Sequence, residues 1–226
     1  MLLLVSWAYH TTTRSPDTSS RKCLRAFTPT DDGMLTGMSG PSFEIPPPRQ
    51  LGGQVLYCDY DAVLHPQSVY VKRRVGPFLS NAPGHRLFEH VALLEELLKP
   101  YPNVHIVLST SWVRRYRGSI ARVTKQFTPS LRARVIGATY HSRMDDASFA
   151  SMARGMQVWS DVLRRRPSAW LAIDDDDYGW PVWCRNQLVK TDLMLGISEP
   201  AVLAELQSML QSTFGRKDGH SVPQHR

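Results

Sequence analysis

The sequence predicts an α/β protein built on a parallel β-sheet with helices on both faces. Short runs of consecutive apolar residues alternate along the chain with segments whose apolar residues recur at helical spacing. Consecutive apolar residues are typical of strands buried on both sides, as in a parallel sheet covered by helices. Two of these runs end directly in aspartates, at the sheet edge where open α/β sheets bind ligands. Alternating strands and helices also imply right-handed crossover connections.

Each expected element has its own signal. Helices are predicted where apolar residues form one stripe, as Leu87, Val91 and Leu94 do, and Ser198 and Pro200 mark the start of the last helix. In chain order we expect a strand over 54–58, a loop with several prolines and glycines, a helix over 86–99, a strand over 104–108, a helix through about 126, a strand over 134–136, a helix through 163, strands over 169–173 and 187–190, and a helix from about 199 to 210.

The first apolar strand leads directly into Asp59 and Asp61, an Asp-x-Asp arrangement. At the carboxyl end of a parallel strand, both carboxylates can face one crevice, where they would hold Mg²⁺ and attack a phosphorus atom. Aspartates after a strand also cap turns readily. Taken alone, the two interpretations are equally good.

A second acidic cluster follows another apolar run, because residues 170–173 lead into the four consecutive aspartates 174–177. If the two strands are adjacent, at least four acidic groups meet, and each raises the pKa of its neighbours. Bound Mg²⁺ would relieve this repulsion, because its hard character suits carboxylate and phosphate oxygens together. The sequence therefore predicts Mg²⁺ as the cofactor.

A third strand, over 104–108, ends in Ser109 and Thr110. Their hydroxyls, together with the free backbone N–H groups of the following helix start, can hold a phosphate oxygen. The alternative is an ordinary helix cap, which Ser and Thr form readily, and taken alone it is the better interpretation. The order of acidic pair, hydroxyls and acidic cluster makes these residues part of a pattern.

This order of motifs resembles the haloacid dehalogenase-like (HAD) superfamily of phosphohydrolases. More narrowly, it resembles the bacterial HAD domains associated with Swiss Army Knife RNA-repair proteins. The resemblance covers roughly residues 54 to 210 and rests on residues 63–66, 106–112, 134–139 and 171–176. It implies a three-layer, Rossmann-like fold with a small flap within 65–84 and a phosphorylated substrate.

The resemblance also implies roles for single residues. In that superfamily the first aspartate of the pair is the nucleophile that forms an aspartyl-phosphate, which implies this role for Asp59. The second aspartate is the general acid and base, which implies that role for Asp61. The hydroxyl that orients the phosphoryl group would be that of Thr110 or Ser109. The Mg²⁺ ligands would be Asp59, Asp61 through its backbone carbonyl, Asp174 and Asp175.

The resemblance further implies one basic residue about twenty positions before the second acidic pair. Arg154 fits this spacing. The apolar face that repeats through residues 149–163 would point Arg154 away from the core, unless the helix breaks near Gly155, where glycine is unfavourable. Otherwise Arg143 or Lys125 takes the role.

One position departs from the family pattern. The residue after the second aspartate is most often glycine in relatives, and here it is Ala62. If the turn needs a positive φ at this position, alanine is strained there. Nearby, His65 follows the same turn and could line the substrate mouth, although a surface or packing role is the better interpretation.

The chain carries a formal net charge of +7, although its predicted site is strongly acidic. Basic residues must therefore gather elsewhere, and two groups are Arg114–Arg122 and Arg164–Arg166. A basic collar at the rim of the site would favour a polyanion such as an RNA or DNA end, although charged runs are usually solvated helix faces. Three cysteines without paired or metal-type spacing indicate reduced thiols in the cytoplasm.

The predicted organisation has three parts. Residues 1–50 are rich in Ser, Thr, Pro and Gly and are expected to be mostly disordered, 51–214 form the HAD-like hydrolase domain, and 215–226 form a polar tail. The apolar start of the chain is too short to span a membrane, so no membrane partner is predicted.

Three functions compete. The first is a Mg²⁺-dependent phosphatase that acts through an aspartyl-phosphate, with nucleic-acid ends as a candidate substrate. The second is a metal-dependent nuclease, in which the order of acidic motifs would be reversed. The third is a catalytically inactive RNA-binding module with the same fold, which the lack of a base-stacking aromatic motif disfavours.

Overall fold

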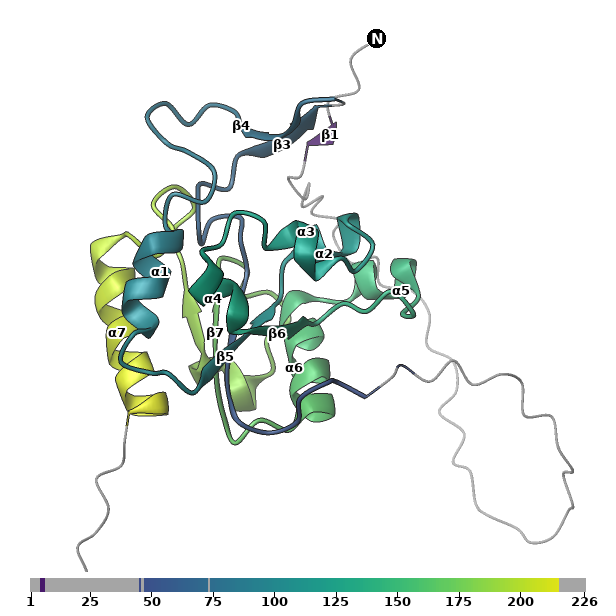
Figure 1. Cartoon of the computed structure of the whole chain (residues 1–226), viewed down its shortest axis with the longest axis vertical. Helices are drawn as coiled ribbons and strands as arrows, with labels where there is room; N and C mark the ends of the chain where they lie inside the picture. The colour runs from purple at the N-terminus through teal and green to yellow at the C-terminus, as the bar shows by residue number, and fades with distance from the viewer. Residues whose placement is uncertain (1–4, 7–44, 46, 73, 216–226) are drawn as a thin grey trace, which may run out of the picture. The chain divides into compact units, whose positions relative to one another are not determined.

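A five-stranded parallel sheet, with strand order β6-β5-β2-β7-β8, forms the centre of the molecule (Figure 1). The computed structural model describes residues 5–6, 45, 47–72 and 74–215 of the 226-residue chain. The strands are β2 (Gln54–Cys58), β5 (Val104–Leu108), β6 (Val135–Ala138), β7 (Ala169–Asp174) and β8 (Leu188–Lys190). The predicted α/β architecture with a parallel sheet is confirmed.

Helices connect these strands. They are α1 (Val91–Leu98), α2 (Ser111–Arg115), α3 (Ile120–Val123), α4 (Pro129–Ala133), α5 (Asp146–Ser151), α6 (Arg154–Arg165), the 3₁₀ helix η1 (Val182–Gln187) and α7 (Pro200–Phe214). Figure 1 shows α1 and α7 on one side of the sheet and α6 on the other.

The central strand β2 is buried on both faces because its side chains alternate between two cores. Leu56 and Cys58 belong to a core completed by apolar residues of α1, α4 and α7. Val55 and Tyr57 point the other way, into a second core with α6 and η1. Burying each aliphatic side chain contributes about 1.5–3 kcal/mol, so the two cores together fix the sheet between its helices.

Several helices are shorter than expected, and the backbone gives the reason. The predicted helix over 86–99 begins only at α1, because Phe88 has a φ of 61°, in the left-handed region. The predicted helix through 126 is divided into α2 and α3, since Arg117 and Gly118 have φ values of 53° and 80°. The predicted helix through 163 is divided into α5 and α6 at the extended residue Met152.

The boundaries of the remaining elements differ from the predicted ones by a few residues. Strand β6 covers residues later than the predicted 134–136, and the short helix α4 before it was not predicted. Helix α7 runs four residues beyond the predicted end, and its cap is Glu199, whose carboxylate accepts the N–H of Val202. Helix η1 replaces the start of the predicted strand over 187–190.

The expected flap is a β-hairpin. It consists of the antiparallel strands β3 (Val69–Lys72) and β4 (Gly76–Leu79), and the two-residue strand β1 (Val5–Ser6) pairs with β3. Apart from β1 and a few residues from Ile45 onward, the segment predicted to be disordered lies outside the described residues. So does the predicted polar tail beyond Gly215.

Two further expectations concern compartment and membrane. Cys58 and Cys184 are buried and free, and Cys23 lies outside the described residues. Among the helices that the structure describes, none is long and apolar enough to cross a membrane.

Candidate active site

Two neighbouring strands carry the predicted carboxylates to one edge of the sheet. Asp59 follows β2 directly, and Asp174 is the last residue of β7. The strands are parallel and adjacent, with Cys58 opposite Ile173, and the Asp59 N–H donates to the Ile173 carbonyl at 3.1 Å. The adjacency on which the sequence interpretation depended is therefore present, and both acidic motifs lie at the carboxyl ends of their strands.

Three carboxylates meet at this edge. Asp59, Asp174 and Asp175 each offer an oxygen, and these oxygens lie within 4.8 Å of one another. Asp59 and Asp174 are buried, while Asp175 is partly exposed. Asp59 Oδ1 and Asp174 Oδ2 are buried and accept no hydrogen bond from any described residue. Because an ionised carboxylate oxygen can only accept, such an atom is satisfied by a cation or by a proton of its own.

The electrostatics of the three groups point in the same direction. Burial, together with the charge of Asp61, raises the pKa of Asp59 to about 6, although the Arg154 guanidinium opposes the shift. Burial and the charge of Asp59 raise the pKa of Asp175 to about 7, and burial raises the pKa of Asp174 well above its usual range. Three carboxylate oxygens with this much mutual repulsion fit a hard divalent cation, whose charge would favour their ionised forms.

Arg154 is the first residue of α6 and reaches two of the three carboxylates. Its Nη2 lies 3.7 Å from Asp59 Oδ2, its Nε lies 3.3 Å from Asp174 Oδ2, and its Nη1 donates to the Ser109 carbonyl. Burial alone would lower the pKa of Arg154, but Asp174 and Asp59 outweigh burial and raise it. The guanidinium therefore stays charged beside the acidic groups.

The helix break that brings Arg154 to the site differs from the expected one. The chain is extended at Met152 and Ala153, just before α6, and Gly155 lies inside the helix. Glycine is needed at Gly155 because a Cβ there would overlap the backbone of Trp180. The alternatives for the cationic role, Arg143 and Lys125, are exposed. Arg154 remains the predicted cation.

The two hydroxyl candidates have different surroundings. The Oγ of Ser109 is buried and has no hydrogen-bond partner among the described residues. Thr110 caps the five-residue helix α2 by accepting the N–H of Trp112 at 3.3 Å, and its hydroxyl also lowers the pKa of Asp59 by hydrogen bonding. Both hydroxyls lie at the carboxyl end of β5, which neighbours β2, so both stay candidates.

Asp61 has contacts of a different kind from the other acids. Its carboxylate is not one of the three that meet among the described residues. It accepts hydrogen bonds from His65 Nε2 and Trp112 Nε1, each at 3.0 Å to Oδ1. His65 is fully buried, so it does not line the substrate mouth. Sequence analysis missed both partners; the four-residue spacing of Asp61 and His65 was the one signal available.

The turn between these residues has the backbone that the family pattern suggested. Ala62 has a φ of 57°, in the left-handed region that glycine adopts without strain. An L-residue there costs about 1–2 kcal/mol relative to its ordinary conformations. Ala62 is fully buried, so the surrounding core holds the turn in place.

The rest of the acidic run is divided between the site and the surface. The side-chain amide of Gln67 donates to Asp175 Oδ2 at 3.2 Å, which ties the start of the flap segment to the acidic cluster. Asp177 instead pairs with Arg185 at 3.1 Å and Lys190 at 2.9 Å. Asp177 is thus paired with surface cations and is not grouped with Asp59, Asp174 and Asp175.

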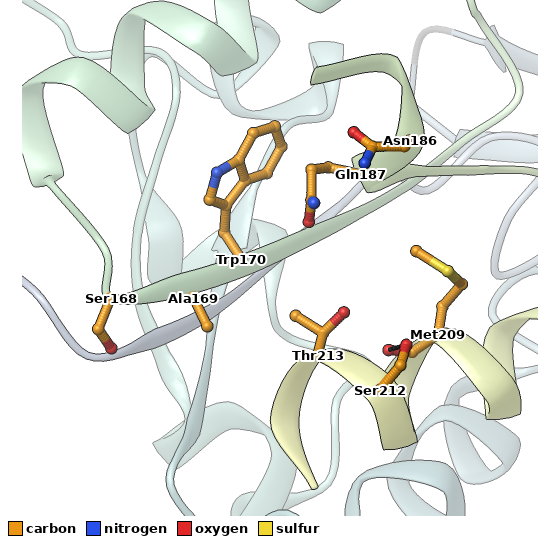
Figure 2. Close-up of a pocket in the computed structure, with 8 residues that line it drawn as sticks. All are labelled: Ser168, Ala169, Trp170, Asn186, Gln187, Met209, Ser212 and Thr213. Carbon is orange, nitrogen blue, oxygen red and sulfur yellow. Dashed lines mark hydrogen bonds between the residues drawn. The ribbon is translucent and has the colours of Figure 1, made fainter. Parts of the chain in front are cut away.

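A separate hollow of about 600 Å³ lies at the other end of the sheet. Figure 2 shows its lining, which comes from the start of β7, the end of η1 and one side of α7: Ser168, Ala169, Trp170, Asn186, Gln187, Met209, Ser212 and Thr213. None of these eight side chains titrates near neutral pH and none is a carboxylate, imidazole or thiol, so this hollow offers neither a general base nor a set of metal ligands.

Comparison with known proteins agrees with this geometry. Residues 55–202 match the family model of the HAD domain in Swiss Army Knife RNA repair proteins, a range that contains the three clustered carboxylates, Asp61, the two hydroxyl candidates and Arg154. No curated protein matches the chain, and no solved structure does. A HAD domain supports a hydrolase of the phosphatase type. Because the match spans well over half of the 226 residues, the chain belongs to the family of HAD domains found in Swiss Army Knife RNA repair proteins.

Proposed function

We propose that the protein is a Mg²⁺-dependent phosphohydrolase that works through an aspartyl-phosphate on Asp59. One observation carries the proposal: carboxylates from two adjacent strands meet at a single point with a largely buried guanidinium beside them. The carboxylates suit a divalent cation and the guanidinium suits a phosphate oxygen, so the site has partners for both.

In the first step, a carboxylate oxygen of Asp59 attacks phosphorus in line with the leaving oxygen. The new P–O bond forms on Asp59 as the bond to the leaving group breaks, and Asp61 gives its proton to the departing oxygen. Arg154 and the Ser109 or Thr110 hydroxyl orient the phosphoryl oxygens and balance the charge that develops on them.

In the second step, water attacks the aspartyl-phosphate. Asp61, now ionised, takes a proton from this water, the bond between phosphorus and Asp59 breaks, and inorganic phosphate leaves. Splitting hydrolysis in this way is ordinary covalent catalysis. A Mg²⁺ ion held by Asp59, Asp174, Asp175 and the Asp61 carbonyl would supply positive charge that lets an anionic nucleophile approach an anionic substrate.

The substrate class that we favour is a phosphorylated nucleic-acid end, as the family's association with RNA repair and the net charge of +7 suggest. The segment after the acidic run also offers exposed aromatic rings, since Tyr178 and, in η1, Trp183 are 76% and 70% exposed. The Tyr178 carbonyl accepts the N–H of Gly155, next to Arg154, so this residue borders the site. Exposed rings of this kind are suited to stacking on bases.

The basic collar expected from the sequence has to be revised. Arg165 is buried and, like Arg164, it pairs with Asp161. Helix α6 starts at the site and runs to the opposite edge of the sheet, so its last arginines lie near the start of β7 rather than near the carboxylates. Of the other group, Arg114 pairs with Asp146 on α5.

The test is a panel of three substrates, each with Mg²⁺ and with EDTA: an aryl phosphate, a 3′-phosphorylated oligonucleotide and the same oligonucleotide without the phosphate. We expect Mg²⁺-dependent release of inorganic phosphate from the first two and no strand cleavage. The Asp59→Asn variant should lose at least about 1000-fold in rate while keeping its circular dichroism spectrum. Asp177→Asn is the matched control and should keep its activity.

Three results would contradict the proposal. Cleavage of the unphosphorylated strand would favour a nuclease. Binding of the oligonucleotide without any turnover would favour an inactive RNA-binding module. An Asp59→Asn variant that retains most of its activity would remove the nucleophile.

A further inference from the structure

The carboxylate of Asp61 is held by two buried aromatic rings. The ring nitrogens His65 Nε2 and Trp112 Nε1 each lie 3.0 Å from Asp61 Oδ1. The side chain of Asp61 is 16% exposed, whereas His65 is fully buried and Trp112 is 4% exposed. Asp61 is therefore held by two buried rings, those of His65 and Trp112. Neither ring belongs to the carboxylate cluster or to the groups proposed to hold the phosphate.

The hydrogen-bond pattern around His65 fixes which of its nitrogens carries the proton. The backbone N–H of Phe88 donates to His65 Nδ1 at 3.4 Å, so in the neutral ring Nδ1 is the acceptor. Nε2 then carries the hydrogen and donates it to Asp61. The indole nitrogen of Trp112 can only donate. Both contacts to Asp61 are therefore N–H groups pointing at a carboxylate.

The two donors have little freedom to move. The ring of His65 packs edge-on against Phe88 and Trp112, with centroids 4.9 and 5.9 Å apart, and Phe88 packs against Trp112 at 5.4 Å. Tyr60 packs against both Phe88 and Trp112. Rings locked together in this way hold their N–H groups at fixed positions, which is how a functional group is kept in one orientation.

We propose that His65 and Trp112 are positioning residues that fix the carboxylate plane of Asp61 for proton transfer. This inference rests on the proposed function, because it assigns a purpose to the acid and base of that reaction. Oδ1 accepts from both rings, whereas Oδ2 has only the second, 3.1 Å contact of the same indole N–H. Oδ2 is thus the oxygen that gives the proton to the leaving group and later takes one from water.

The test uses the dependence of rate on the leaving group. Proton donation matters most when the departing oxygen is a poor leaving group, as in phenyl phosphate, and least when it is a good one, as in 2,4-dinitrophenyl phosphate. Trp112→Phe removes one N–H and keeps a ring. In single-turnover assays we expect it to slow cleavage of phenyl phosphate about tenfold or more and cleavage of the dinitrophenyl ester about twofold or less.

Trp159→Phe is the matched control, because its ring packs against Trp170 and Trp183, away from Asp61. We expect both esters to be cleaved by this variant at the native rate. His65→Gln keeps an N–H donor and should retain more activity on phenyl phosphate than His65→Leu. If the rings had a purely structural role, the variants would slow the cleavage of both esters by the same factor, and that outcome would overturn the proposal.

A spectroscopic measurement covers the case in which a variant does not fold. The Trp112 indole proton, followed by NMR in the full chain, should shift when Asp61→Asn removes the carboxylate. An unchanged indole resonance would show that the contact does not exist in solution. If the native protein hydrolyses neither ester, the proposed function fails. If the native protein hydrolyses the esters and Asp59→Asn does not, the proposed function stands. In that case, a Trp112→Phe variant that behaves like Trp159→Phe would overturn only the positioning role.

Discussion

Two buried clusters of arginine and aspartate lie at opposite ends of α6, and their charge balance differs. At the carboxyl end, Arg165 is 1% exposed and donates to Asp161 Oδ2 and to the Gln50 carbonyl, each at 3.0 Å. Arg164 pairs with the other oxygen of Asp161, and the Tyr57 hydroxyl donates to Oδ2 at 3.0 Å. Each oxygen of this single carboxylate has partners.

At the amino end the proportions are reversed. Arg154 is one cation facing three carboxylates, and its Nε has no hydrogen bond with acceptable geometry among the described residues, although Asp174 lies at ion-pair distance. Oxygens of Asp59 and Asp174 are also left without donors in the described part of the chain.

The ratio of guanidiniums to carboxylates, and the hydrogen bonds that they make, distinguish a structural ion cluster from the proposed active site. Both are buried, and both contain arginine and aspartate. The cluster around Asp161 has two guanidiniums for one carboxylate and uses its hydrogen-bonding capacity within the protein. The cluster around Asp59 keeps unused capacity and excess negative charge, and such a site gains by binding a cation and an anion from solution.

The largest expected effect concerns the two buried arginines themselves. Arg154→Met should lower kcat/KM for an aryl phosphate about 100- to 1000-fold, because phosphoryl oxygens lose their charged donor. Arg165→Met should do the opposite, lowering stability while the folded fraction keeps its activity. Steady-state kinetics at saturating Mg²⁺ measures kcat/KM of both variants, and urea denaturation measures their free energies of unfolding. Equal kinetic losses in both would mean that the two clusters do not differ in role.

The next effect is on stability. Asp161→Asn removes the carboxylate that neutralises buried Arg165, and breaking a buried pair in this way costs about 3 kcal/mol or more. The free energy of unfolding from urea titration measures it. Asp59→Asn provides the comparison, and in EDTA it should leave the protein as stable as before or more stable, because it removes excess negative charge. A destabilised Asp59→Asn variant together with an unaffected Asp161→Asn variant would reverse the distinction.

The smallest effect is a dependence of stability on pH in the metal-free protein. The pKa of Asp175 is raised to about 7 by burial and by Asp59, so the folded protein binds this proton more tightly than the unfolded chain does. Stability should therefore fall as pH rises from about 4 to about 7. Asp59, with a pKa of about 6, acts in the same direction.

Thermal unfolding in EDTA at several pH values measures this slope. Asp175→Asn should flatten it, and Mg²⁺ should do the same by stabilising the ionised carboxylates. Asp177→Asn is the control, because its pKa is lowered by Lys190 and Arg185 at the surface. A slope of the opposite sign would show that these carboxylates are not repelling one another in the folded protein.

The sequence predicted the sheet and its acidic edge because both depend on local pattern. Uninterrupted apolar runs identified β2, β5 and β7, and the aspartates that follow β2 and end β7 lie where parallel strands bring them together. The spacing that selected Arg154 picked a residue that lies beside the carboxylates, because the extended residues before α6 turn it toward them; its role as the phosphate-binding cation stays a prediction.

Other features depend on contacts between residues distant in sequence, and local pattern does not reveal them. The interruptions at Phe88 and Arg117 are non-glycine residues with positive φ, a conformation that composition does not signal. Trp112 lies 51 residues from Asp61 and reaches it only because β5 is adjacent to β2. The expected collar at Arg164–Arg166 was wrong because the charge run was assigned without regard to the direction of its helix.

The spacing between two of the candidate ligands is set by the sheet itself. Asp59 and Asp174 each come directly after the paired residues Cys58 and Ile173 of hydrogen-bonded strands, so the interstrand repeat of about 4.8 Å sets the separation of their backbones. That repeat is the same in every β-sheet and does not respond to side-chain substitution. The backbone would therefore limit the distance between these two candidate ligands, and a larger cation would have to be accommodated by rotamers of Asp175 rather than by widening this gap.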